Sequence, residues 1–154
     1  MRYVMVYKRI ISIVLALVIG AVMCGCSEET LRARSVDEIK DYLVQNDYYN
    51  EKTFAVNSTQ DFSSFGGVMN NDWTIFFFDY GEDQEAADKM IELMLSGITL
   101  TNEEHKANYV IYEYDSDPNY TLFVRINNTF LQVYGPKESK KQIRELAENL
   151  GYYK

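Results

Sequence analysis

The chain has 154 residues, of which 47% are hydrophobic and 14% aromatic, and its 23 acidic residues outnumber its 15 basic ones. Three of the basic residues and none of the acidic ones lie in residues 1–25, so residues 26–154 carry 12 basic against 23 acidic side chains, a net charge of −11. Such a charge repels phosphate backbones and anionic headgroups, which argues against nucleic acid as a partner. The length after residue 25 suits one core, which is too little for the two lobes of a solute-binding protein.

The start of the chain has the pattern of an export signal. Basic residues within the first nine positions precede an apolar run over residues 10–23, which is shorter than the roughly 20 residues of a membrane-spanning helix. The run ends in Met23-Cys24-Gly25-Cys26, which resembles the lipobox of bacterial lipoproteins. In that family the cysteine after a small residue receives a diacylglyceryl group and becomes the new N-terminus. Because Gly25 is small and Met23 is not, we expect Cys26 to be the lipidated residue.

This resemblance implies an extracytoplasmic protein, anchored through Cys26 to the outer side of the cytoplasmic membrane. We expect residues 1–25 to be a signal peptide, residues 26–34 a lipid-anchored tether, and residues 35–154 one α+β domain. Both cysteines of the chain lie at or before position 26. The domain therefore contains no disulfide, cysteine nucleophile or thiolate metal site.

The first predicted element of the domain is a helix. Ser35 and Glu38 have the spacing of a capping box, in which each side chain bonds the backbone N–H of the other residue. Apolar residues at helical spacing follow, so we expect the helix to run to about Asn46. For residues 47–71 we expect mostly loop with a turn or two of helix, because Asn57-Ser58-Thr59 is typical of a turn and Gly66-Gly67 breaks helices.

The strongest strand signal is residues 73–80, WTIFFFDY, which is apolar in both registers. A strand of this kind is typically covered on both faces of a sheet. Residues 81–95 then predict a helix, with acidic residues in the first turn and a buried stripe of alanine, methionine and isoleucine.

Three more strands are predicted over residues 107–115, 120–126 and 129–134. The two-residue turn Asn127-Asn128 joins the last two as a hairpin, which places Ile126 opposite Thr129, Val124 opposite Leu131 and Leu122 opposite Val133. Gly135-Pro136 then begins a final amphipathic helix.

The predicted fold class is α+β, with element order α-β-α-β-β-β-α. We expect a mainly antiparallel four-stranded sheet with two helices on one face, the face of Leu122, Val124, Leu131 and Val133. The first helix and residues 47–71 would partly cover the opposite face.

Three segments carry a further resemblance: Phe77 to Ala87, the hairpin Arg125 to Gly135, and Leu150-Gly151-Tyr152. In these segments the domain resembles small uncharacterised lipoproteins of Gram-positive bacteria. The resemblance implies the architecture and the surface location, and it implies no activity.

Several polar constellations favour structural roles. Asp115-Ser116-Asp117-Pro118-Asn119 opens like an EF-hand loop, but Tyr120 replaces the required glycine and Ile126 the bidentate glutamate, so we predict a turn over a weak Ca²⁺ site. Acidic residues at positions 79–85 suit the start of a helix. His105 is the single histidine and is expected in an exposed polar loop, so neither a zinc site nor a catalytic triad is expected.

The aromatic second face of the sheet is the candidate ligand-binding surface. Phe123, Phe130 and Tyr134 alternate with the core residues on the last two strands, and Arg125 stands among them as an anchor for an acidic group. The alternative is that Phe54, Phe62 and Phe65 of the N-terminal segment bury this face. We therefore expect a non-enzymatic lipoprotein without cofactor or metal, which binds a protein, peptide or glycan. The alternative function is a stoichiometric inhibitor or assembly protein of the cell envelope.

Overall fold

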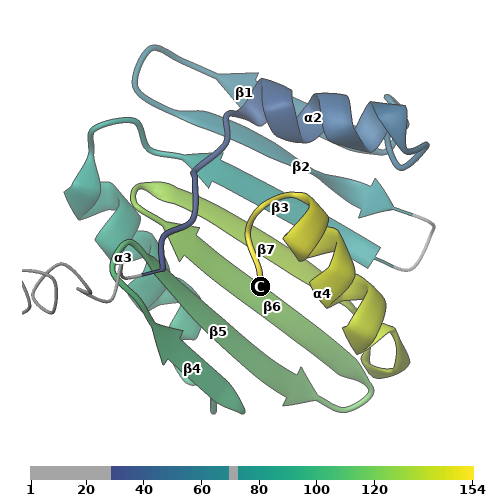
Figure 1. Cartoon of the computed structure of the whole chain (residues 1–154). Coiled ribbons are helices and arrows are strands. Elements are labelled where there is room, and N and C mark those ends of the chain that lie inside the picture. Colours follow the sequence, from purple (N-terminus) through teal and green to yellow (C-terminus); the bar gives the residue numbers. More distant parts are fainter. Residues whose placement is uncertain (1–28, 70–72) are drawn as a thin grey trace, which may run out of the picture.

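The computed structural model describes residues 29–69 and 73–154. The strands are β1 (Phe54–Ser58), β2 (Ser63–Met69), β3 (Trp73–Asp79), β4 (Asn102–His105), β5 (Tyr109–Ser116), β6 (Asn119–Ile126) and β7 (Thr129–Pro136). The helices are α2 (Val36–Gln45), α3 (Gln84–Leu95) and α4 (Lys140–Asn149), with the 3₁₀ turn η1 (Lys137–Ser139) before α4. The seven strands form one antiparallel sheet in the order β1-β2-β3-β7-β6-β5-β4 (Figure 1).

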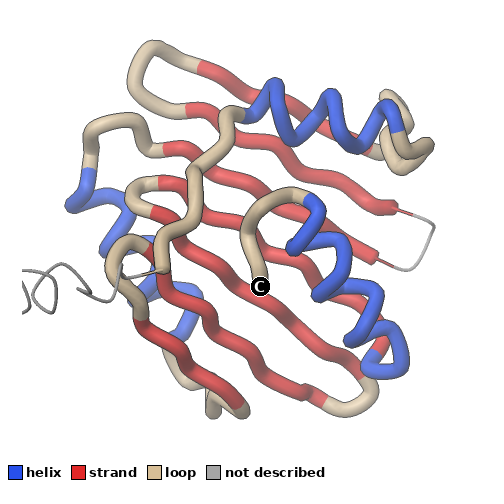
Figure 2. The backbone as a smooth tube through the Cα atoms, in the orientation of Figure 1, coloured by secondary structure: helices blue, strands red, loops and turns tan. Residues whose placement is uncertain are grey.

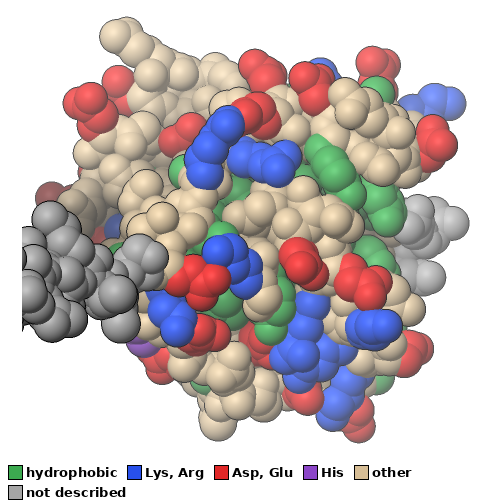
Figure 3. Space-filling view, viewed as in Figure 1, with side chains coloured by type: hydrophobic (Ala, Val, Ile, Leu, Met, Phe, Trp, Pro, Cys, Tyr) green, Lys and Arg blue, Asp and Glu red, His purple; other side chains and the backbone are tan. Residues whose placement is uncertain are grey.

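The main core lies on the sheet face that α2 and α4 cover, called the first face here (Figure 1). Side chains alternate along each strand, so every second residue of the central strands points into this core. Ile75, Phe77, Leu122, Leu131 and Val133 are completely buried there. On the outside of this layer, acidic and basic side chains intermingle (Figure 3).

Both ends of the described chain pack on the first face. Residues 29–35 run as a loop across the sheet, beside the C-terminal segment, to the start of α2 (Figure 2). The backbone of Leu31 exchanges two hydrogen bonds with the side chain of Asn108, at 3.0 and 2.7 Å. The buried Tyr152 places its hydroxyl 2.6 Å from Thr129 Oγ1 and accepts the N–H of Arg34. The predicted boundary at residue 35 therefore leaves out residues that pack with the domain.

Helix α3 alone covers part of the opposite, second face, among the described residues. Its Ile91, Met94 and Leu95 pack against a smaller cluster built on three buried rings. Those rings belong to Tyr112, Phe123 and Phe130. These rings belong to β5, β6 and β7. Helix α3 therefore covers this half of the second face and does not extend over β1 and β2.

The predicted four-stranded sheet is wrong, as is its element order, because the sheet has seven strands. The predicted placement of helices is wrong too. The 81–95 helix joins β3 to the far edge strand β4 and crosses the second face, whereas α2 shares the first face with α4. Because both faces of the central strands are apolar, the sequence pattern did not decide which face each helix covers.

The loop predicted over residues 47–71 is a hairpin of β1 and β2 within the described residues. The turn lies at residues 59–62, where Thr59 N–H donates to Phe62 O at 2.7 Å, and not at residues 57–59. Gly66 and Gly67 lie inside β2 because neighbouring rings occupy the space of their side chains. A Cβ on Gly66 would lie 2.7 Å from the ring of Phe76, and one on Gly67 would lie 2.4 Å from the ring of Phe54.

The local predictions on the last hairpin and the first helix are confirmed. Strands β6 and β7 pair with Ile126 opposite Thr129, and Asn127 takes a positive φ of 51° in the turn. At α2, the Ser35 hydroxyl accepts the N–H of Glu38, and the Glu38 carboxylate accepts the N–H of Ser35.

We expect Tyr152 to make the domain sensitive to alkali. Burial of the phenol raises the pKa of Tyr152 to about 12, from 10.0, against the opposing effect of its hydrogen bond with Thr129. Between pH 10 and 12 the folded state holds a proton on Tyr152 that the unfolded state releases. The contribution of the protonated phenol to the free energy of unfolding is therefore complete below pH 10 and is lost as the pH rises toward 12. Two pH units correspond to about 2.7 kcal/mol.

Urea unfolding between pH 8 and 11.5 measures this effect, with Tyr152→Phe as the comparison. The variant should lose stability less steeply above pH 10 than the parent protein. Parallel pH profiles for the two proteins would contradict the assignment.

The predicted lipobox and Cys26 lie outside the described residues. Within residues 29–69 and 73–154, no helix is both long and apolar enough to cross a bilayer.

Candidate binding sites

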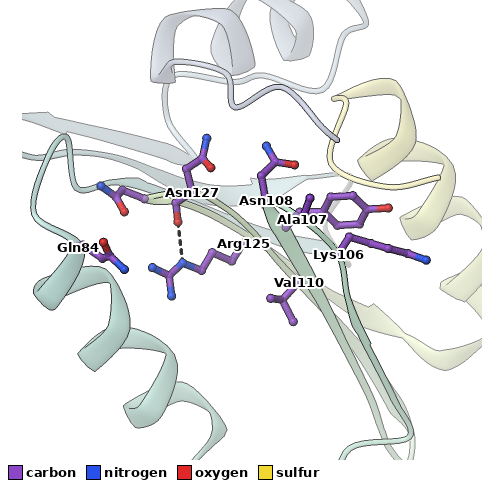
Figure 4. A pocket seen from close by; sticks show the side chains of 9 residues that line it. Gln84, Lys106, Ala107, Asn108, Val110, Arg125 and Asn127 are labelled. Carbon is purple, nitrogen blue, oxygen red and sulfur yellow. Dashed lines mark hydrogen bonds between the residues drawn. The ribbon is translucent and has the colours of Figure 1, made fainter. Parts of the chain in front are cut away.

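The first candidate site is a polar hollow at the end of β5 and β6, called the Arg125 hollow (Figure 4). It has a volume of about 380 Å³. Its lining consists of Gln84, Lys106, Ala107, Asn108, Tyr109, Val110, Arg125, Asn127 and Asn128. Three asparagines and one glutamine give it hydrogen-bonding groups without net charge. The charge of the hollow therefore comes from Lys106 and Arg125, which would attract an acidic ligand.

Both cations of this hollow are engaged within the protein. Arg125 Nη1 lies 2.5 Å from Asp88 Oδ1 of α3, and its Nε donates to the backbone oxygen of Asn127 at 2.6 Å. Lys106 extends away from Arg125 in Figure 4 and pairs with Glu104 at 3.0 Å. An acidic ligand would have to displace Asp88 to reach Arg125. The role of Arg125 as a ligand anchor stays a prediction.

The other predicted ligand-binding residues do not share one surface. Phe123 and Phe130 lie under α3, with 2% and 3% of their surface exposed. Tyr134 is half-buried beside Thr74 of β3, on the part of the second face that α3 leaves. The N-terminal segment, which was the alternative cover of the second face, does not bury that face with Phe54 and Phe65. These two rings stack on each other in the core of the first face.

Rings on the second face nevertheless form a continuous row across three strands, β6, β7 and β3. Phe123 contacts Phe130, and Phe130 contacts Phe78, with centroid distances of 5.8 and 6.5 Å. Phe78 stacks on Phe76 at 6.3 Å. The row therefore begins under α3 and ends at Phe76, which is 39% exposed.

The second candidate site lies at this open end and is called the aromatic groove. It has a volume of about 270 Å³. It is lined by Ala55, Asn57, Ser64, Phe65, Gly66, Phe76 and Phe78. The Phe76 ring lies over Gly66, 2.7 Å from where a Cβ would stand, and the small side chain of Ala55 lies opposite Gly66 on β1. Val68, at 43% exposure, extends the apolar surface along β2.

The segment that builds the groove is strongly acidic. Residues 51–83 contain six acidic residues and one lysine, a net charge of −5. Residues 84–154 contain eleven acidic and eight basic residues, a net charge of −3 over more than twice the length. The groove therefore favours a ligand that combines apolar groups with positive charge.

The polar residues for which the sequence predicted structural roles pair with other residues of the protein. Asp115 pairs with Lys140 at 3.2 Å and with Lys137 at 3.6 Å. Asp83 caps α3 by accepting the N–H of Ala86 at 2.9 Å. The predicted loop at His105 is wrong, because this residue lies on edge strand β4, 2.6 Å from Glu103.

Phe76 is the most exposed ring of the groove, and the sequence did not indicate it as a binding residue. The run WTIFFFDY indicated an apolar second face on β3, because a strand with large rings in both registers is buried only when other elements pack on both faces of the sheet. With α3 displaced toward β5 and β6, one register of β3 keeps an exposed ring.

No protein-family model and no curated protein matches the chain. Among solved structures, the crystal structure of a GTP binding regulator from Thermotoga maritima is similar with a TM-score of 0.45 and 12% sequence identity. The similarity covers 82% of this chain and 96% of that chain. At this TM-score and identity it has no weight for fold or function.

Proposed function

We propose that the chain is a non-enzymatic binding module of the cell envelope, anchored by lipid on Cys26, that binds a peptide segment of a partner protein in the aromatic groove. The single observation behind this proposal is the exposed Phe76 ring, which lies over Gly66 next to the small side chain of Ala55. Apolar surface of this kind is retained where a partner covers it.

A peptide suits the groove better than a glycan does. Glycans need hydrogen-bonding side chains around an aromatic platform, whereas this lining offers phenylalanine rings with Asn57 and Ser64 as its polar side chains. The charge of residues 51–83 adds attraction for lysine and arginine side chains, which a neutral glycan lacks.

The lipid anchor supplies the second part of the proposal. Leu31 is fixed to the domain by Asn108, and it lies five positions after Cys26 in the chain. A fully extended chain spans at most about 18 Å over that distance. A lipid on Cys26 would therefore hold the domain against the membrane surface, where it meets membrane-bound or wall-bound partners.

A peptide library displayed on phage tests the binding function on the full-length protein in lipid nanodiscs. We expect peptides to be enriched that combine aromatic or aliphatic residues with lysine or arginine. Phe76→Ser should weaken their binding at least about tenfold, because the ring is the exposed wall of the groove.

Leu93→Ser is the matched control, since Leu93 is apolar and 74% exposed on α3, away from the groove. It should leave binding unchanged. Peptides that bind Phe76→Ser as well as the parent protein, or a library without enrichment, would contradict the proposal. Binding of cell-wall glycan in place of peptide would do so too.

A further inference from the structure

Strand β1 forms one edge of the sheet, and its free backbone groups can be identified. Thr53 O accepts the N–H of Val68 at 3.1 Å, and Thr59 N–H donates to Phe62 O at 2.7 Å. In an antiparallel pair, hydrogen-bonded residues alternate with residues whose groups point away. Ala55 and Asn57 therefore bond to β2, while the N–H and C=O groups of Phe54, Val56 and Ser58 face outward.

The two edges of the sheet differ in how they are protected. Strand β4 at the far edge is short and carries two glutamates in its four residues. Strand β1 has the sequence FAVNS, with neither a charged residue nor a proline. Charge and proline are the usual means of preventing strand addition at an edge. Edge β1 is thus open to a further strand.

The aromatic groove continues from this edge. Ala55 lies opposite Gly66, and Gly66 lies opposite Phe76, so one row of the second face runs from the edge through two small residues to an exposed ring. A strand added beside β1 would place every second side chain at the end of this row. An aromatic side chain there can lie over Ala55 and meet Phe76.

Resting on the proposed function, we infer that the partner is an extended basic peptide that adds to β1 as an antiparallel strand, with its apolar side chains in the groove. Its basic side chains then lie on the first face, where α2 presents three acidic residues and one lysine. A second copy of the chain suits this edge less well, because two bodies of charge −11 repel each other.

The test uses a labelled synthetic peptide of alternating lysine and phenylalanine, seven residues long with lysine at both ends, and full-length protein in nanodiscs. Residues opposite each other in an antiparallel pair share a face. With phenylalanine in the groove, the lysine N–H groups face Val56 and its neighbours, and the phenylalanine N–H groups face solvent. N-methylation of the lysine residues should weaken binding at least about tenfold, and N-methylation of the phenylalanine residues should leave it nearly unchanged.

Val56→Pro gives an independent check, because it removes one outward N–H without touching the bonds from β1 to β2. We expect roughly fivefold weaker binding. If both N-methylated peptides bind alike while Phe76→Ser still abolishes binding, strand addition is wrong and the groove function stands. If Phe76→Ser leaves binding intact, the groove function itself is wrong. A dimer in sedimentation that Val56→Pro disrupts would assign the edge to a second copy and overturn the inference.

Discussion

Replacing Phe77 by alanine is expected to lower the free energy of unfolding by about 3–5 kcal/mol, because its ring is completely buried at the centre of the sheet. Phe77 lies opposite Phe65 of β2 and Leu131 of β7. It also meets Tyr152 edge to face at 5.8 Å, which joins the C-terminal segment to the core. The resulting cavity would thus loosen three parts of the fold together.

Phe76→Ala is the matched control, one residue away in the same strand and on the opposite face. Its ring is partly exposed, so we expect a cost of about 1 kcal/mol or less. Urea denaturation of both variants measures the difference. Equal costs for Phe76 and Phe77 would contradict the assignment of faces.

Replacing Arg144 by methionine is expected to cost about 3 kcal/mol, since it leaves the Glu113 carboxylate without its main partner. The Glu113 side chain is 1% exposed and lies 2.5 Å from Arg144 Nη2. The Tyr153 hydroxyl donates to the same carboxylate at 2.9 Å, and Lys140 lies 3.7 Å away. These two contacts remain in the variant, which keeps the loss below the largest values for buried pairs.

Thermal unfolding of three variants measures how much the Glu113–Arg144 ion pair contributes to stability. Lys141→Met, whose side chain is 86% exposed on the same helix, should change stability by less than about 0.5 kcal/mol. The double variant Glu113→Leu with Arg144→Met should recover to within about 1 kcal/mol of the parent, because the unpaired charge is gone. A double variant as unstable as Arg144→Met alone would disprove this role of the pair.

The sequence predicted the features that short-range patterns decide. The β6–β7 register followed from the Asn127-Asn128 turn, because a two-residue loop permits one pairing of the alternating residues. The start of α2 followed from Ser35 and Glu38, whose side chains satisfy backbone groups of the same turn.

Features that depend on contacts distant in sequence were not predictable in the same way. The glycines of β2 resemble a loop until Phe54 and Phe76 are placed over them. Strand β4 is too short and polar to be recognised, since only its pairing with β5 makes it a strand. The position of α3 on the second face depends on β4 lying at the far edge.

The sequence indicated aromatic residues on the second face, but it did not indicate which of them would be exposed. An aromatic second face was expected from Phe123 and Phe130, and these rings are there, but α3 covers them. The exposed end of the same row is Phe76, two strands away from Phe123. Only the order of the strands identifies it.

Hydrogen–deuterium exchange with and without the lysine–phenylalanine peptide tests whether the aromatic groove is the binding surface. The full-length protein in nanodiscs is compared at equal peptide occupancy. Binding in the groove predicts slowed exchange in β1 and its neighbours, residues 54–69 and 74–78. Slowed exchange confined to residues 106–110 and 125–128 would place binding in the Arg125 hollow and contradict binding in the groove.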